Sequence, residues 1–376
     1  MQRRDALGAL GVIGLAGAVP SAGAAGVTGT EVLLGQSAVI SGPLGVPIKA
    51  LNAGAQMAFD AVNAQGGVHG RRIRVITIDD ELAPPKAVAN YQKLLEEQGV
   101  VAMFGCVGSG TTAAAARLLQ QHGCASVGGY AVADSAREKA RNHAFFVRAS
   151  TGREAEVLVR QLGTIGITRI AVAHLDNPGG LEALALVTKA MASMQAKPVA
   201  AGALAGDSGN AAQLARELAA QQPQAVIMYL AGRAPADLMK ALREAGSSPM
   251  FYGMSIVAGE VVAQVLGEQA RGLAVAQVVP YPWHSVDNDI LAYRKASQAA
   301  KAEPSYYTLE GWINAQVMIE ALKRAGRDPS RARLLQVMRA LKMRIAGMEL
   351  DFTGGAIAGS RFVELVQVRF DGKFVR

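Results

Sequence analysis

The sequence from Val100 to Val127, VVAMFGCVGSGTTAAAARLLQQHGCASV, holds an apolar run, a glycine-rich turn, a segment of helical period and a second apolar run. Apolar runs without polar alternation are typical of strands that are covered on both faces. Two such strands joined by a helix form a parallel β-α-β unit. The stretch therefore predicts an α/β fold, with Val107, Gly108 and Ser109 directly after the first strand.

The same alternation continues along the 376 residues. A first helix is predicted where Leu51, Ala55 and Ala58 share one face. The series pauses at Arg148–Gly152 and restarts, so we expect two doubly wound, Rossmann-like lobes with a cleft beside the hinge, about six strands in the first and roughly four or five in the second. The predicted strands cover 32–39, 72–79, 100–104, 125–127, 145–148, 169–174, 198–204, 225–229 and 250–252.

The first 24 residues have the features of a signal peptide. Arg3 and Arg4 precede an apolar run that ends at Ala22-Gly23-Ala24. Adjacent arginines allow the twin-arginine (Tat) route as well as the general (Sec) route. The run is shorter than the roughly 20 apolar residues that a membrane span needs. We therefore expect export to the periplasm.

Charge and histidine spacing argue against several classes of partner. The net charge is +8, from 38 Lys and Arg against 30 Asp and Glu. The basic residues are scattered and form no long stretch interleaved with aromatic residues, so we expect no nucleic-acid binding. The five histidines show no metal-ligand spacing with one another or with the cysteines. We expect neither a metal nor a cofactor.

Cys106 and Cys124 could form a disulfide in an oxidising compartment. However, Cys106 follows one predicted strand and Cys124 opens the next, so in parallel neighbours they lie about a strand length apart, roughly 15 Å. A disulfide tolerates about 7 Å between Cα atoms. We expect two free, largely buried thiols.

Motifs for enzyme chemistry are incomplete. The stretch 105–112 is similar to a phosphate-binding loop, but Thr111 occupies the position of its lysine. Ser109 lacks the Gly-x-Ser-x-Gly context of a nucleophile elbow. We therefore expect a protein without catalytic residues, and an exported hydrolase is the least favoured alternative.

Several stretches have an order and spacing that are specific when taken together. They are Ser41-Gly42-Pro43, Asn63–Gly70 followed by Arg72–Asp80, Phe146-Val-Arg-Ala-Ser150, Pro280-Tyr-Pro-Trp283, Leu309-Glu-Gly-Trp312 and Gly359-Ser-Arg-Phe-Val363. Through them nearly the whole mature chain resembles the type I periplasmic binding proteins, in particular the leucine/isoleucine/valine-binding group with its amide and aromatic-acid relatives.

The resemblance implies how the chain is organised and what it does. It implies one lobe of residues 27–147 with 279–347, a second lobe of 148–278 with 348–376, and three hinge crossings. It implies a monomeric substrate-binding component of an ABC transporter, which closes on a small-molecule ligand and is recognised by a permease in the inner membrane. A periplasmic ligand-sensing subunit of a signalling system, with the same fold, is the alternative.

The resemblance also places ligand contacts in the first lobe. Val107, Gly108 and Ser109 precede a helix whose first N–H groups are unpaired and attract a carboxylate. Ser109 matches the family's carboxylate-binding serine, and the alternative is that Ser109 and Thr111 only cap the helix.

A second wall of the site is expected from Gly129, Tyr130 and Ala131, where the family usually presents backbone groups and a Ser or Thr. Tyr130 then either stacks on the ligand or packs in the hinge.

Three residues of the second lobe bear on ligand chemistry. Ser255 stands where the amino-acid binders have a glutamate for the ligand's ammonium, and an unpaired buried ammonium costs several kcal/mol. Either the ligand lacks an amino group or Asp176 supplies the charge. Arg233, where relatives have a tyrosine, favours an organic or aromatic carboxylate over a leucine-like amino acid, unless it is a solvated arginine at a helix start. Amino acid, amide and organic acid all stay open.

Overall fold

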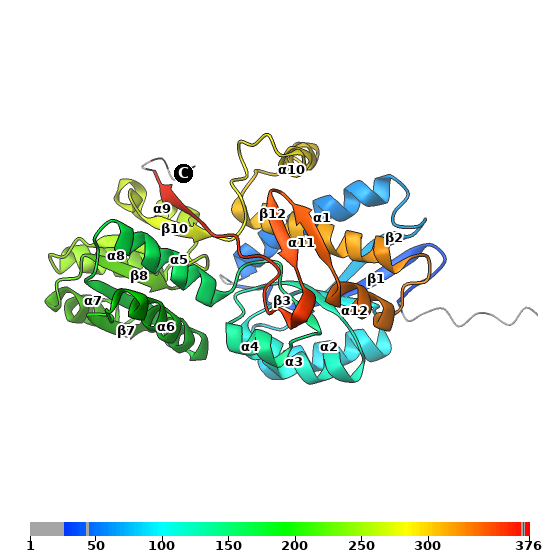
Figure 1. Cartoon of the computed structure of the whole chain (residues 1–376), viewed down its shortest axis with the longest axis horizontal. Coiled ribbons are helices and arrows are strands. Elements are labelled where there is room, and N and C mark those ends of the chain that lie inside the picture. Colours follow the sequence, from blue (N-terminus) through cyan, green and yellow to red (C-terminus); the bar gives the residue numbers. More distant parts are fainter. Residues whose placement is uncertain (1–25, 43–44, 370, 372) are drawn as a thin grey trace, which may run out of the picture.

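The computed structural model describes residues 26–42, 45–369, 371 and 373–376. Two lobes lie side by side, each a sheet flanked by helices (Figure 1). The expected signal peptide, residues 1–24, lies outside the described residues. In the described part of the chain, no helix has both the length and the apolar character needed to cross a membrane.

Lobe 1 is built on a five-stranded sheet in the order β2-β1-β3-β4-β5, with every pairing parallel. The strands are β1 Glu31–Ala38, β2 Arg72–Asp79, β3 Ala102–Val107, β4 Ser126–Tyr130 and β5 Ala144–Phe145. The helices of this half are α1 Gly45–Ala64, α2 Pro84–Gln92, α3 Ser109–Gln121 and α4 Asp134–Lys139. Strands β3 and β4 are buried along almost their whole length, as expected of strands covered on both faces.

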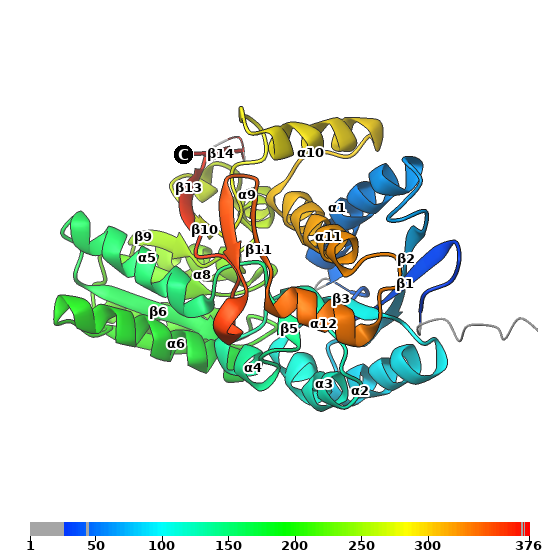
Figure 2. The ribbon, with the colours of Figure 1, turned by 45° about the vertical axis from the view of Figure 1, so that its right-hand side comes forward.

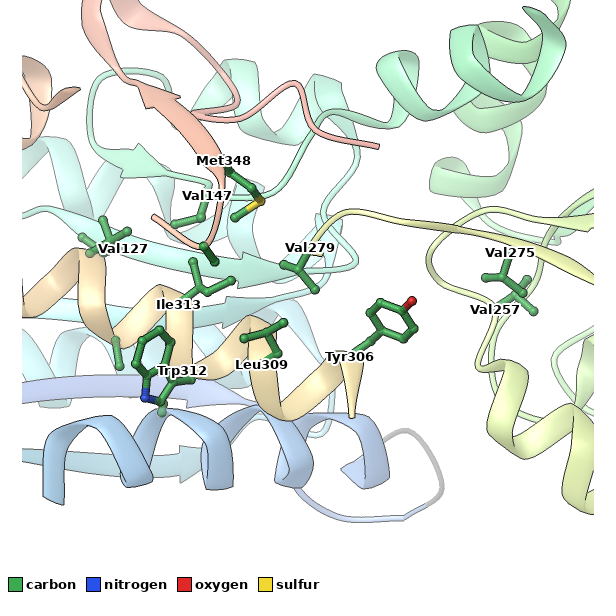
Figure 3. Close-up of a cluster of buried hydrophobic side chains, with 14 of the residues drawn as sticks. Val127, Val147, Val257, Val275, Val279, Tyr306, Leu309, Trp312, Ile313 and Met348 are labelled. Atoms are coloured by element: carbon green, nitrogen blue, oxygen red, sulfur yellow. The ribbon is translucent and has the colours of Figure 1, made fainter. Parts of the chain in front are cut away.

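Three helices from late in the sequence also pack on lobe 1 (Figure 2). They are α10 Asn288–Ala299, α11 Tyr306–Ala325 and α12 Arg331–Arg339. Helix α11 begins at a capping box made by Ser305 and Thr308. It then buries Leu309, Trp312 and Ile313 in the hydrophobic core (Figure 3).

Helices α1 and α11 cross so closely that their backbones are in contact. Two glycines permit this close approach. A Cβ atom at Gly54 would lie 1.8 Å from the carbonyl oxygen of Thr308, and one at Gly311 would lie 1.8 Å from the carbonyl oxygen of Leu51. Any side chain at either position would therefore push the helices apart.

Lobe 2 is built on a seven-stranded sheet in the order β14-β13-β10-β9-β8-β6-β7. The strands are β6 Ile170–Leu175, β7 Ala200–Leu204, β8 Ala225–Tyr229, β9 Met250–Gly253, β10 Ala274–Gln277, β13 Glu364–Val368 and β14 Phe374–Val375. The helices are α5 Thr151–Thr164, α6 Pro178–Met191, α7 Ala211–Ala220, α8 Ala234–Glu244 and α9 Gly259–Leu266.

The distribution of strands differs from the expectation, because lobe 1 has the smaller sheet and lobe 2 the larger one. The C-terminal segment returns to lobe 2 and adds β13 and β14, which pair antiparallel. These two strands and β10 lie outside the strands predicted from the sequence.

Three segments connect the lobes, between β5 and α5, between β10 and α10, and between β12 (Met348–Asp351) and β13. The strand predicted at 145–148 leaves the sheet after its first residue. The reason is that the carbonyls of Phe146 and Val147 accept hydrogen bonds from the N–H groups of Gly359 (2.7 Å) and Ser360 (3.0 Å). Two of the crossings thus lie side by side.

A hairpin of β11 Lys342–Ile345 and β12 Met348–Asp351 spans the expected boundary between residues 347 and 348. Directly after it, the ring of Phe352 packs edge-on against Phe145 of lobe 1, with 5.6 Å between centroids. We therefore propose lobes of 27–147 with 279–360 and of 148–278 with 361–376.

The two cysteines are both free and buried, as expected. Cys106 lies opposite Gly129 in the β3–β4 register, whereas Cys124 precedes β4. Burial raises the pKa of both thiols, that of Cys124 to about 12. Neither is a reactive thiolate at neutral pH.

Candidate functional site

The turn between β3 and α3 requires a glycine. Gly108 caps α3 with φ of 84°, and a Cβ atom there would lie 2.7 Å from Leu82 Cδ1. The Thr111 hydroxyl donates to the carbonyls of Gly108 (3.0 Å) and Val107. The N–H groups of the first turn, from Ser109 to Thr111, have no acceptor inside the helix, and the helix dipole favours an anion there.

Ser109 ties this turn to the loop after β4. Its Oγ accepts a hydrogen bond of 2.9 Å from the N–H of Ala133, and α3 has no side-chain cap. The expected alternative, that Ser109 and Thr111 cap the helix, is therefore wrong. In the same loop Ala131 has φ of 54°, a strained left-handed conformation of the kind that clusters at binding sites.

Tyr130 packs in the hinge. The Arg148 guanidinium lies 5.0 Å above its ring, and the ring of Tyr307 meets it edge-on at 5.9 Å. Burial raises the pKa of Tyr130 to about 12. Val107, Gly129 and Tyr130 also line a cavity of about 20 Å³, which has room for a water molecule but not for an organic ligand.

The start of α6 faces Ser109 from lobe 2. Asn177 caps the helix with its side chain, and Pro178 occupies the first helical position. A Cβ atom at Gly179 would lie 3.6 Å from Ser109 Oγ and 3.8 Å from the Tyr229 hydroxyl. The two lobes therefore meet at Ser109 and Gly179.

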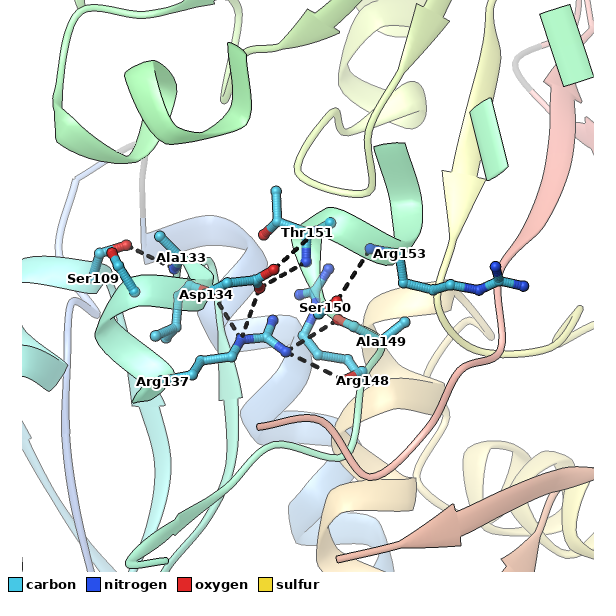
Figure 4. A network of polar contacts seen from close by, with 12 residues as sticks. Ser109, Ala133, Asp134, Arg137, Arg148, Ala149, Ser150, Thr151 and Arg153 are labelled. Carbon is cyan, nitrogen blue, oxygen red and sulfur yellow. Dashed lines mark hydrogen bonds and ion pairs between the residues drawn. The ribbon is translucent and has the colours of Figure 1, made fainter. Parts of the chain in front are cut away.

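Helix α4 of lobe 1 also contacts two helices of lobe 2. The Asp134 carboxylate accepts hydrogen bonds from the N–H groups of Thr151 (2.9 Å) and Gly152 (3.0 Å) at the start of α5 (Figure 4). The N–H (2.9 Å) and hydroxyl of Ser135 both donate to the Glu182 carboxylate on α6. These hydrogen bonds join the two lobes directly.

Arg137 is buried beside these contacts and donates hydrogen bonds to three backbone carbonyls. Its Nε donates to the Val132 carbonyl (2.9 Å), and its Nη1 donates to those of Ala149 (3.2 Å) and Arg148 (3.4 Å) (Figure 4). Burial lowers the pKa of Arg137, and Asp134, 3.9 Å away, opposes this effect.

Arg148, Glu154, Ser255 and Glu310 form a buried group at the first crossing, here named the hinge cluster. Arg148 Nη2 lies 3.8 Å from Glu154 Oε1, and its Nη1 lies 3.4 Å from Glu310 Oε1. The Ser255 N–H (2.6 Å) and hydroxyl (2.8 Å) donate to the Glu154 carboxylate. Arg148 Nη2 donates in turn to the Ser255 hydroxyl.

Burial is the largest single influence on the pKa values of the ionisable groups in the hinge cluster. It raises the pKa of Glu154 and of Glu310, and Arg148 partly offsets each shift. Burial opposes the charge of Arg148 itself, yet Glu310 and Glu154 raise its pKa above the usual value. The pKa of Tyr229 is raised by burial and then by the charge of Glu154.

The residues expected from lobe 2 are only partly brought together. Asp176 is exposed, and Arg233, whose side chain is 70% exposed, pairs with Asp237 on its own helix at 3.0 Å. Among the described residues neither has a recorded contact with the hinge cluster. Ser255 lies within it, and the carboxylate that Ser255 contacts is that of Glu154.

Sequence reasoning gave no role to Arg148, Glu154 or Glu310. Arg148 and Glu310 are charged residues within otherwise apolar stretches, which is a usable signal for a buried ion pair. Glu154 gives no such signal, because it lies on an amphipathic helix next to the charged residues Arg153 and Glu156.

The described residues form no competing centre. An open groove of about 930 Å³ between α5 and α6 has mixed charges from Arg153, Glu156, Arg160 and Lys189, and no member of the hinge cluster lines it. No three His, Cys, Asp or Glu side chains in the described ranges are placed to hold a metal ion.

Comparisons with known proteins agree with this geometry. A family described as periplasmic binding protein matches residues 31–373. The Leu/Ile/Val-binding protein homolog 1 of Brucella melitensis is 24% identical over 317 residues, which cover 83% of this chain and 82% of that protein. The Leu/Ile/Val-binding protein of Escherichia coli K12 is 25% identical over 259 residues, covering 67% and 68%.

Among solved structures, a substrate-binding periplasmic protein from Ralstonia solanacearum superposes with a TM-score of 0.84 and 28% sequence identity, covering 92% of this chain and 99% of that one. The match to the family spans nearly all of the described residues and both lobes. The chain belongs to the periplasmic binding protein family and has its type I fold.

Proposed function

We propose that this protein is the substrate-binding component of an ABC importer, which closes around a small carboxylate-bearing solute and delivers it to an inner-membrane permease. The observation that carries this proposal is the apposition of Ser109, at the start of α3, to Gly179 and Tyr229 of lobe 2. Unpaired N–H groups and two hydroxyls gather there, which suits a carboxylate. The protein acts as a monomer, after export by the Sec or Tat route, and performs no chemistry on its ligand.

Ligand binding is tested by thermal unfolding of the mature protein with amino acids, amides, dicarboxylates and aromatic acids. A ligand at 100 times its Kd stabilises the folded state by about 2.7 kcal/mol. Ser109→Ala should weaken binding of the active compound about 10- to 100-fold, because a hydrogen bond to a charged group contributes roughly 1.5–3 kcal/mol. Ser193→Ala, on the exposed surface of lobe 2, is the control. The absence of any response to carboxylates would contradict the proposal.

Closure of the cleft is tested at Gly179. We expect Gly179→Phe to weaken ligand binding at least about 30-fold, since a ring there would meet Ser109 and Tyr229 before the lobes close. The unfolding midpoint without ligand should change little, because the ring can point into an opened cleft. Calorimetric titration measures the affinity.

The matched control is Leu181→Phe, which places the same ring two residues along α6, where the native side chain is 59% exposed. Its affinity should equal that of the wild type. Wild-type affinity in Gly179→Phe would show that the lobes do not close at this point.

A further inference from the structure

The beginning of α6 meets lobe 1 at two points. A Cβ atom at Gly179 would lie 3.6 Å from Ser109 Oγ, at the start of α3. One helical turn further along α6, the Glu182 carboxylate accepts hydrogen bonds from the N–H of Ser135 (2.9 Å) and from its hydroxyl. Residues three positions apart lie on the same face of a helix. A single movement of α6 toward lobe 1 therefore makes both contacts.

The two points are also connected to each other within lobe 1. Ser109 Oγ accepts a hydrogen bond of 2.9 Å from the N–H of Ala133, two residues before Ser135 (Figure 4). Buried Arg137 holds the same segment, because it donates to the Val132 carbonyl and to two carbonyls of the first crossing. The start of α4 is therefore fixed in lobe 1, in direct contact with the turn at which we propose that the ligand's carboxylate binds.

Two carboxylates link α4 to lobe 2, and they differ in their distance along the chain from the hinge. Asp134 accepts hydrogen bonds from the N–H groups of Thr151 and Gly152, which directly follow the first crossing. Glu182 lies on α6, which the chain reaches only after α5 and β6. Opening of the lobes should therefore preserve the contact of Asp134 and break the contact between Glu182 and Ser135.

We propose that Glu182 and Ser135 form a latch, which stabilises the closed arrangement of the lobes and prolongs the time for which the ligand is held. The inference rests on the proposed function and adds a positioning residue to it, because Glu182 acts on closure and not on the choice of ligand. A ligand that binds the closed arrangement better loses apparent affinity by the factor by which the closed population falls.

The first test removes the carboxylate of the latch. Water replaces its hydrogen bonds when the lobes open, so Glu182→Ala should weaken ligand binding only about fivefold. The change should lie in the dissociation rate constant, because the latch forms after the ligand has entered the open cleft. The probes are L-leucine, succinate and benzoate. Calorimetric titration measures the affinity, and stopped-flow fluorescence measures the two rate constants.

The matched control is Glu217→Ala, which removes an exposed glutamate from α7 of the same lobe. The Glu217 carboxylate accepts a hydrogen bond from Gln213 on its own helix. This variant should bind and release each probe as the wild type does. The loss in Glu182→Ala should be the same factor for every probe that binds.

The second test couples the two members of the latch. Ser135→Ala removes the hydroxyl but keeps the N–H, and it should weaken binding about twofold. Combining it with Glu182→Ala should add no further loss, because the hydroxyl acts through the carboxylate. The unfolding midpoint without ligand should stay near that of the wild type in all three variants, whereas a merely structural role would lower it.

The outcomes separate the latch from the function beneath it. A wild-type dissociation rate in Glu182→Ala overturns the inference and leaves the proposed function standing. Additive losses in the double variant do the same, as does a loss whose size differs between probes, which would place Glu182 at the ligand itself. A wild-type protein that binds none of the three probes overturns both.

Discussion

We expect Arg148→Met to lower the free energy of unfolding by roughly 3–5 kcal/mol at neutral pH, the usual cost of removing one partner from a buried ion pair. The substitution keeps the apolar stem but leaves Glu154 and Glu310 without their positively charged partner. Their side chains are 5% and 6% exposed. It also removes the guanidinium that lies over the Tyr130 ring. Chemical denaturation followed by far-UV circular dichroism measures the loss.

The loss should grow as the pH rises. Burial already raises the pKa of both glutamates in the native fold, and Arg148 is the largest opposing influence on each. Without it, the folded-state pKa rises further above that of the unfolded chain. A carboxyl with a raised folded pKa contributes stability that is complete below its unfolded pKa and is lost as the pH rises through its folded pKa. Arg148→Met should therefore be closest to the wild type near pH 4.5 and furthest from it near pH 8.

Two comparisons isolate the charge from the packing. Adding Glu310→Gln to Arg148→Met removes one stranded acid and should recover part of the stability. Arg233→Met removes an arginine whose side chain is 70% exposed and should stay within about 0.5 kcal/mol of the wild type. A deficit that is constant from pH 5 to pH 8 would show that the hinge cluster does not carry unbalanced charge.

A strand that is buried on both faces has a continuous apolar sequence. Most of the parallel strands could therefore be predicted from the sequence. Strand β8, Ala225–Tyr229, agrees residue for residue with its prediction, and so does β2, Arg72–Asp79. The C-terminal strands escaped prediction because they lie at the edge of the sheet, where β13 pairs antiparallel with β10 and β14 pairs with β13, and a long stretch of chain separates both from β10. Local composition does not encode such a pairing.

The part of the candidate site that lies at the carboxyl ends of strands could be predicted from the sequence. Ser109 and Tyr130 could be placed because neighbouring parallel strands present their carboxyl ends at one edge. Ser255 and Glu154 are 101 positions apart and belong to different elements, so their hydrogen bond could not be predicted from a single sequence.

The second large effect on stability is expected at Gly311, where α11 crosses α1. Alanine forms helix better than glycine by about 1 kcal/mol, so Gly311→Ala would stabilise an unpacked helix. Here we expect the opposite, a loss of about 3 kcal/mol, because the new Cβ atom would lie 1.8 Å from the Leu51 carbonyl oxygen. Backbone atoms cannot rotate away, so the two helices must separate and the buried contacts of α11 must loosen.

The same substitution at Gly163, inside α5, is the control. A Cβ atom there would meet the Met194 side chain at 2.4 Å, and a flexible thioether can move aside. Gly163→Ala should therefore be neutral or stabilising by up to about 1 kcal/mol. If the free energy of unfolding falls in Gly311→Ala and does not fall in Gly163→Ala, the cost at Gly311 comes from the helix crossing. If it changes in the same direction in both variants, α1 and α11 can shift to accept a side chain at their contact.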